Sequence, residues 1–187
     1  MKEFEQFRSI YRQILLKPEI KAQAIPAAVV VLFLELPEQE PQVLLIERNQ
    51  YEGHHSGQMA LPGGKMDPND LDLREAAARE VLEEIGVEIN PTSLDYITEH
   101  WIHVSNYWMT AFSIRIKKKL TYDLNKREIN RIFEIPVSFF QDPANIIPFE
   151  VSYDGNKILS PSFTYEGNLI WGATALIMYQ LFHGEEY

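Results

Sequence analysis

The sequence predicts an α/β (α+β) fold in which one mixed β-sheet packs against helices. Apolar, β-branched runs alternate with segments of helical periodicity, in the order helix, strands, helix, strands, helix. The chain has 187 residues, 45% of them hydrophobic, which is enough for one sizeable core. We therefore expect a single domain over residues 1–187, with an N-terminal helical extension over residues 1–25.

The elements follow from the pattern in chain order. Apolar residues at helical spacing from Phe4 to Leu15 predict an N-terminal helix. After the breakers Pro18 and Pro26, two apolar runs predict paired central strands, AAVVVLFLEL and VLLIER. Further strands are predicted in LDYITEHWIHV, YWMTAFSIRIK, EINRIFEIP, IPFEVS and ILSPSF, with the turn YDGNK between the last two. A final helix is predicted in WGATALIMYQLFHG, ending at Gly184.

The middle helix has the clearest boundaries. Asp72 followed three residues later by Glu75 is an Asp version of the capping box, and Gly86 is a typical helix stop. The helix therefore spans LREAAAREVLEEI. Its apolar face is predicted to consist of Ala77, Val81 and Ile85.

Three glutamates on this helix, Glu80, Glu83 and Glu84, are candidate metal ligands because their spacing brings the carboxylates into one region of space. Like charges so placed cost only about 0.2–0.5 kcal/mol per pair, so a solvated acidic face is the alternative. The preceding loop favours a site, because Gly63 and Gly64 allow close backbone approach. A ligand set of carboxylate oxygens together with a backbone carbonyl oxygen suits Mg²⁺ or Mn²⁺.

Other classes of function are excluded by composition and motif. The chain has no Cys, which removes disulfides, thiolate metal sites and cysteine nucleophiles. A formal net charge of -10 argues against a nucleic-acid partner. There is no P-loop, EF-hand, dinucleotide fingerprint or G-x-S-x-G motif. The start does not resemble a signal peptide and no apolar run has membrane-spanning length, so we expect a cytoplasmic protein without a membrane partner.

The segment GGKMDPNDLDLREAAAREVLEEIGV, residues 63–87, resembles the Nudix box, G-x5-E-x7-R-E-U-x-E-E-x-G-U with U aliphatic. The second half matches throughout, from Arg79 to Val87. In the first half Asp70 occupies the Glu position, and eight residues separate it from Arg79. This longer form resembles the coenzyme A diphosphatase branch of the Nudix hydrolases. The resemblance implies a Nudix α/β/α sandwich with a mixed β-sheet between helices.

A second signature of that branch, L-L-T-x-R-[SA]-x3-R-x3-G-x3-F-P-G-G, resembles LLIERNQYEGHHSGQMALPGG, which keeps its length. The matching residues are Leu44, Leu45, Arg48, Gly57, Pro62, Gly63 and Gly64. Four residues depart from it: Ile46 replaces Thr, Asn49 replaces Ser or Ala, Gly53 replaces the second Arg, and Leu61 replaces Phe. The C-terminal segments REINRIFEIPVSFF and IWGATALIMYQLF also resemble this branch.

The resemblance implies a metal-dependent diphosphate hydrolase that cleaves coenzyme A or acyl-coenzyme A to 3′,5′-ADP and (acyl-)4′-phosphopantetheine. The implied metal ligands for Mg²⁺ or Mn²⁺ are Glu80, Glu83, Glu84 and the Gly64 carbonyl. Arg79 would hold a neighbouring carboxylate, and Glu80 is the first candidate for the base that activates water. The implied substrate contacts are Arg48, Gly63, Gly64 and Lys65.

Several residues outside these motifs have two interpretations. Glu128 lies where some Nudix enzymes supply an extra acid, and a surface position beside Arg127 and Arg131 is the alternative. His54 and His55 either touch a phosphate or belong to a solvated loop. The aromatic residues Trp101, Tyr107 and Trp108 either stack on an adenine or belong to the core.

Two other functions stay open at this point. The substitutions at Ile46 and Gly53 are compatible with other nucleoside diphosphate derivatives, namely nucleoside triphosphates, NADH, ADP-ribose or nucleotide sugars. A non-catalytic Nudix-fold nucleotide-binding module is the alternative of another class, and the intact R-E-x-x-E-E segment argues against it. A homodimer through the N-terminal helix is compatible with the sequence.

Overall fold

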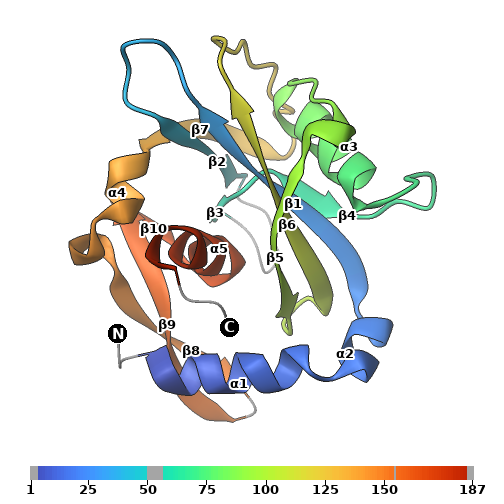
Figure 1. The fold of residues 1–187 in the computed structure, drawn as a ribbon, viewed down its shortest axis with the longest axis vertical. Helices are drawn as coiled ribbons and strands as arrows, with labels where there is room; N and C mark the ends of the chain where they lie inside the picture. The colour runs from blue at the N-terminus through green and yellow to red at the C-terminus, as the bar shows by residue number, and fades with distance from the viewer. Residues whose placement is uncertain (1–3, 50–56, 154, 185–187) are drawn as a thin grey trace. The chain divides into compact units, whose positions relative to one another are not determined.

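The larger of two β-sheets organises the computed structural model, which describes residues 4–49, 57–153 and 155–184 (Figure 1). Its strands are β1 (Ile25–Leu34), β2 (Gln42–Arg48), β3 (Met59–Ala60), β4 (Gly63–Lys65), β5 (Asp95–Ile102), β6 (Tyr107–Ile116) and β7 (Ile129–Pro136). The order is β3-β2-β1-β6-β5, with β4 beside β1 and β7 beside β2. Because β1 is parallel to β6 and antiparallel to β2, the sheet is mixed, as predicted.

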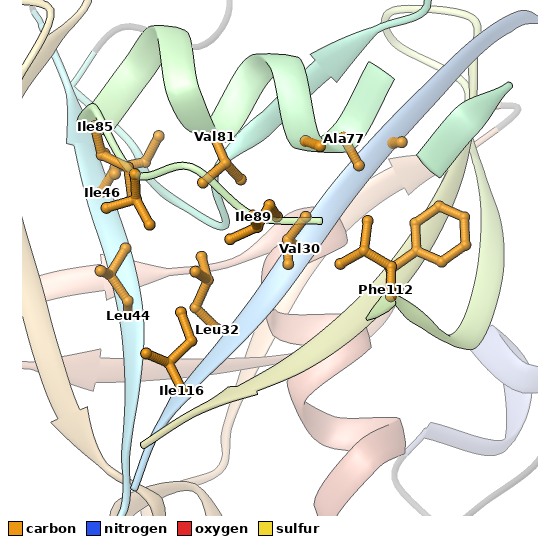
Figure 2. Packing of buried hydrophobic residues seen from close by; sticks show 14 of the residues in the cluster. Val30, Leu32, Leu44, Ile46, Ala77, Val81, Ile85, Ile89, Phe112 and Ile116 are labelled. Carbon is orange, nitrogen blue, oxygen red and sulfur yellow. The ribbon is translucent and has the colours of Figure 1, made fainter. Parts of the chain in front are cut away.

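The helix α3 (Leu73–Ile85) packs on β1 and β4 of this sheet. Both predicted ends are confirmed: Asp72 Oδ1 accepts from the backbone N–H groups of Arg74 and Glu75, and Gly86 ends the helix at φ 70°. Figure 2 shows the apolar side chains of α3 directed toward those of β1 and β2. The predicted apolar face is fully buried there: Ala77, Val81 and Ile85.

The glycine loop lies between two central strands that diverge. The predicted pairing of β1 with β2 is confirmed, but it covers only Phe33 with Val43 and Leu34 with Gln42. Further along, β4 pairs with β1 and β3 pairs with β2. The sequence did not predict β3 and β4, because segments of two and three residues are too short to show a period.

The chain divides into two compact units, one of residues 25–137 and a second of residues 1–24 with 138–187. The elements of the second unit are α1 (Glu5–Leu15), α2 (Pro18–Gln23), β8 (Ile147–Tyr153), β9 (Asn156–Tyr165), β10 (Asn168–Ile170) and α5 (Gly172–His183), with most of α4 (Val137–Gln141). Within this unit, α1 and α5 each pack on β9. The expectation of a single domain over residues 1–187 stays a prediction.

Two features of this second unit differ from the sequence interpretation. The strands β8, β9 and β10 form their own antiparallel sheet and do not join the large one, because successive hairpins pair them with one another. Pro18 begins α2, although it was interpreted as a breaker. A proline at the first helical position removes only an N–H that has no partner within the helix. None of the described helices is long and apolar enough to cross a membrane.

The helices α3 and α5 each end at a glycine with left-handed backbone conformation, and comparing the two glycines tests how tightly the end of α3 is packed. A Cβ on Gly86 (φ +70°) would lie 2.7 Å from Asp123 Cβ, whereas one on Gly184 (φ +66°) would meet nothing within 4 Å. Gly184→Ala should cost about 1 kcal/mol of unfolding free energy from backbone strain alone. Gly86→Ala should cost clearly more, and equal costs in chemical denaturation would contradict the tight contact with Asp123.

Candidate active site

Arg79 is the centre of a hydrogen-bond network that joins the glycine loop to α3. Its Nε and Nη2 donate to Asp70 Oδ1 and Oδ2, each at 3.0 Å. Nη2 also donates to the Lys65 carbonyl at 3.1 Å. Nη1 donates to Glu80 Oε1 at 2.8 Å and to Glu83 Oε2 at 3.1 Å. These five bonds match the five N–H donors of a guanidinium group, so Arg79 fixes the loop and two of the three glutamates together.

Asp70 has a role that the sequence interpretation did not assign. It accepts the paired bonds from Arg79 and a further bond from the Asp67 N–H at 2.7 Å. The hydrogen bond from Arg79 is the main cause that lowers the pKa of Asp70 below its ordinary value. The sequence signal was its place in the box, where Asp stands for Glu. The shorter side chain still reaches Arg79.

Glu80 lies against the backbone of Gly64. A Cβ on Gly64 would be 2.5 Å from Glu80 Cδ, so only glycine leaves room for this carboxylate. The Glu80 side chain is 16% exposed. Burial is the main cause that raises the pKa of Glu80, while the hydrogen bond from Arg79 opposes the rise. The close approach that the sequence predicted for the glycine loop is therefore one between Gly64 and Glu80.

Glu84 is the most deeply buried acid of the site, with a side chain that is 1% exposed. Its Oε2 accepts from the Gly63 N–H at 2.9 Å, and Arg48 Nη1 lies 3.5 Å from its Oε1. Burial raises the pKa of Glu84 to about 8, although Arg48 and the Gly63 N–H both act to lower it. Glu84 is therefore mostly protonated at neutral pH when no cation is bound.

The described residues contain no group of three or more His, Asp or Glu side chains arranged to hold a metal ion. Glu83 is 55% exposed and is bound by Arg79. Glu84 offers a donor atom that suits a hard cation, because its Oε1 is buried without a hydrogen-bond partner within the described residues. Glu80 and Glu84 both adjoin the glycine loop. The role of all three glutamates as ligands stays a prediction.

The remaining predicted residues divide into three groups. Glu128 lies in the turn before β7, and its charge adds to the burial that raises the pKa of both Glu80 and Glu84. Lys65 is exposed at the end of β4. The predicted residues that lie outside the described part of the chain are Gly53, His54 and His55.

Of the three aromatic candidates, Trp108 is buried, which confirms its interpretation as a core residue. Trp101 and Tyr107 are half-buried, and the Trp101 Nε1–H donates to Asn106 Oδ1 at 3.1 Å. This bond joins the end of β5 to the turn before β6. Adenine stacking by these two residues stays a prediction.

Comparison with known proteins gives the family. The NUDIX domain model matches residues 24–140, and the chain belongs to the Nudix family. It is 28% identical over 170 residues to "Uncharacterized Nudix hydrolase NudL" of Escherichia coli O7:K1 (strain IAI39 / ExPEC), over 89% of this chain and 88% of that one. It is 31% identical over 160 residues to "Nudix hydrolase 15, mitochondrial" of Arabidopsis thaliana, over 81% of this chain and 55% of that one.

Solved structures show the same fold. A MutT/nudix family protein from Enterococcus faecalis has a TM-score of 0.53 and 17% identity, over 74% of this chain and 52% of that one. The NUDIX domain of Shewanella oneidensis NrtR, complexed with ADP ribose, has a TM-score of 0.52 and 16% identity, over 67% of this chain and 81% of that one. The mixed α/β fold with a central mixed sheet is thus the Nudix fold.

Family membership makes the chain a Nudix hydrolase that acts on nucleoside diphosphate derivatives. Nudix hydrolases generally use divalent metals such as Mg²⁺ or Mn²⁺. The predicted Nudix family is confirmed, whereas the names of these relatives specify no coenzyme A substrate.

The raised pKa of Glu84 predicts how stability depends on pH without metal. Between the ordinary pKa of 4.5 and the folded value of about 8, the folded state holds a proton that the unfolded state has lost. This stabilisation is complete below pH 4.5 and is lost as pH rises through 8. In EDTA, Glu84→Gln should therefore become more stable than the wild type by on the order of a few kcal/mol at pH 9.

The control for this measurement is Glu88→Gln, which changes an exposed glutamate beyond the helix end. Chemical denaturation at pH 5, 7 and 9 measures both variants against the wild type. A difference between Glu84→Gln and the wild type that does not change with pH would show that Glu84 is ionised throughout.

The contact between Gly64 and Glu80 predicts strong coupling between the two residues. Gly64→Ala should destabilise the protein by about 1–3 kcal/mol, because the new Cβ overlaps the Glu80 carboxyl. In a Glu80→Ala background the same change should cost much less, since the overlapping atoms are gone. Chemical denaturation of the four proteins measures this cycle, and additive costs would contradict the contact.

Proposed function

We propose that the chain is a metal-dependent hydrolase that cleaves coenzyme A or acyl-coenzyme A to 3′,5′-ADP and (acyl-)4′-phosphopantetheine. The observation that supports hydrolysis is the placement of two buried or half-buried carboxylates, Glu80 and Glu84, against Gly63 and Gly64. The coenzyme A substrate is supported by the upstream signature, whose Arg48 lies beside Glu84.

We assign the metal to Glu80, Glu84 and the Gly64 carbonyl, with Glu83 as a further ligand once it leaves Arg79. A bound Mg²⁺ or Mn²⁺ would neutralise phosphate charge and lower the pKa of a water molecule. Binding would require ionised ligands, so Glu84 would hold the cation as a carboxylate, without the proton that its raised pKa favours in the metal-free protein. Arg79 retains its paired bonds to Asp70 and keeps Glu80 in place.

The protein's own residues would then perform three tasks. Glu80 would accept the proton of the attacking water, because its carboxylate lies against the glycine loop beside the other assigned ligands. Arg48 and Lys65 supply positive charge for the diphosphate, and the fork of the Arg48 guanidinium suits phosphate oxygens. Glu128 adds a carboxylate from the turn before β7.

Two alternatives follow from specific observations. Ile46 and Gly53 depart from the coenzyme A signature, which keeps nucleoside triphosphates, NADH, ADP-ribose and nucleotide sugars as candidate substrates. The NrtR domain was crystallised with ADP ribose, so a nucleotide-binding module is the alternative of another class. A homodimer and a cytoplasmic location stay predictions from the sequence.

Product analysis tests the proposal directly. Purified protein is incubated with Mg²⁺ or Mn²⁺ and either coenzyme A, acyl-coenzyme A, NADH, ADP-ribose or nucleoside triphosphates, and mass spectrometry identifies the products. We expect 3′,5′-ADP from coenzyme A. Glu84→Gln should lower the rate by about 10²-fold or more, because it weakens a contribution of several kcal/mol. Glu88→Gln should have the wild-type rate.

Products from another substrate alone would overturn the coenzyme A assignment and leave the hydrolase. No product from any substrate, together with saturable ADP-ribose binding, would favour the binding module.

A further inference from the structure

The turn that carries Glu128 leads into β7, close to a break in the pairing of β7 with β2. Strands β2 and β7 pair regularly up to Glu47 with Arg131, but the next pair is Arg48 with Ile129. Asn130 is therefore an extra residue in β7, a β-bulge, and its side chain donates to Glu47 Oε2 at 3.2 Å. Bulges of this kind redirect the neighbouring chain and are frequent beside active sites.

Asn125 connects this turn to α3 by a hydrogen bond. Its backbone N–H donates to the Glu84 carbonyl at 3.0 Å, at the end of α3. Its own carbonyl accepts from the N–H groups of Glu128 (2.9 Å) and Ile129 (2.8 Å). Its side chain makes two further hydrogen bonds within the turn: Oδ1 accepts from the Arg127 N–H at 3.2 Å, and Nδ2 donates to Glu128 Oε1 at 3.1 Å.

Asn49 holds the same turn from the opposite side. Its backbone N–H donates to the Glu128 carbonyl and its Nδ2 donates to the Lys126 carbonyl, both at 2.7 Å. Asn49 directly follows Arg48, whose guanidinium lies beside Glu84. Asn49 is also a departure from the coenzyme A signature, where Ser or Ala stands. An alanine at this position would have no side-chain donor for the Lys126 carbonyl.

The clamped turn places Glu128 beside the end of α3. The Glu128 N–H donates to the Asn125 carbonyl and the Asn125 N–H donates to the Glu84 carbonyl, so two backbone hydrogen bonds connect Glu128 with the helix that carries the glutamates. Arg131, the alternative partner in the sequence, donates instead to Glu47 Oε2 at 2.7 Å. The hydrogen bonds therefore place Glu128 next to the end of the helix that carries the glutamates.

We propose that Asn49 and Asn125 are positioning residues whose amides clamp the turn of residues 125–128 and so hold the Glu128 carboxylate beside the end of α3, the helix that carries Glu80 and Glu84. This inference rests on the proposed function, in which Glu128 acts with the helix glutamates. Neither asparagine touches the substrate, and each acts through Glu128. The clamp has two independent anchors, the end of β2 and the end of α3.

A double-mutant cycle between Asn49 and Glu128 tests the clamp. Asn49→Ala should lower kcat about tenfold and leave KM nearly unchanged, in the range typical of residues that orient a reacting group. In a Glu128→Gln background the same change should have almost no further effect. The control is Asn168→Ala, because the Asn168 amide also donates to a backbone carbonyl, that of Glu166, at 3.0 Å. It should lose comparable stability in thermal unfolding and keep wild-type kcat.

The same cycle on the Mn²⁺ dissociation constant, measured by electron paramagnetic resonance, needs no substrate. Asn49→Ala and Glu128→Gln should each weaken Mn²⁺ binding a few-fold, and the double variant should be no weaker than Glu128→Gln. If the wild type hydrolyses nothing, the proposed function fails and the Mn²⁺ cycle alone decides the clamp. Additive effects of Asn49→Ala and Glu128→Gln, or an Asn49→Ala variant that matches Asn168→Ala, would overturn the proposal.

Discussion

The candidate active site depends on one guanidinium group, that of Arg79, with every donor engaged. Arg79 binds Asp70 and the Lys65 carbonyl on the loop side, and Glu80 and Glu83 on the helix side. Exposed ion pairs are worth little, about 0–1 kcal/mol, but this network is 28% exposed at Arg79 and includes a paired contact with Asp70. Its main effect is therefore geometric. The flexible, single-headed amine of lysine has no equivalent fork.

A second constraint opposes the first. Glu84 is buried where its charge is unfavourable, with one backbone N–H at 2.9 Å and the Arg48 guanidinium at 3.5 Å as partial compensation. Glu128 and Glu80 add like charge, so the metal-free site favours the protonated acid. Perturbed acids of this kind cluster at functional sites. A structural salt bridge would need neither the burial nor the surrounding glutamates.

The sequence predicted what short-range signals encode. Both caps of α3 and its apolar face were correct because capping residues and a helical period are local. The separate sheet of β8 to β10 depends on tertiary pairing and was not predicted. Within the site, the spacing named the glutamates but did not distinguish buried Glu84 from exposed Glu83. Glu84 follows Ala77 by seven residues and so lies on the apolar face, a signal that was present.

The divergence of β1 and β2 connects these features. Because the two strands pair at only two positions, β3 and β4 occupy the space between them, and the glycine loop lies beneath α3. The apolar face of α3 fixes the rotation of the helix, and that rotation directs Glu80 onto Gly64 and Glu84 onto Gly63. At Arg48, the end of β2 away from its pairing with β1, a bulge in β7 and two asparagine amides hold the turn that carries Glu128. Packing thus holds together acids that would repel one another if all of them were ionised.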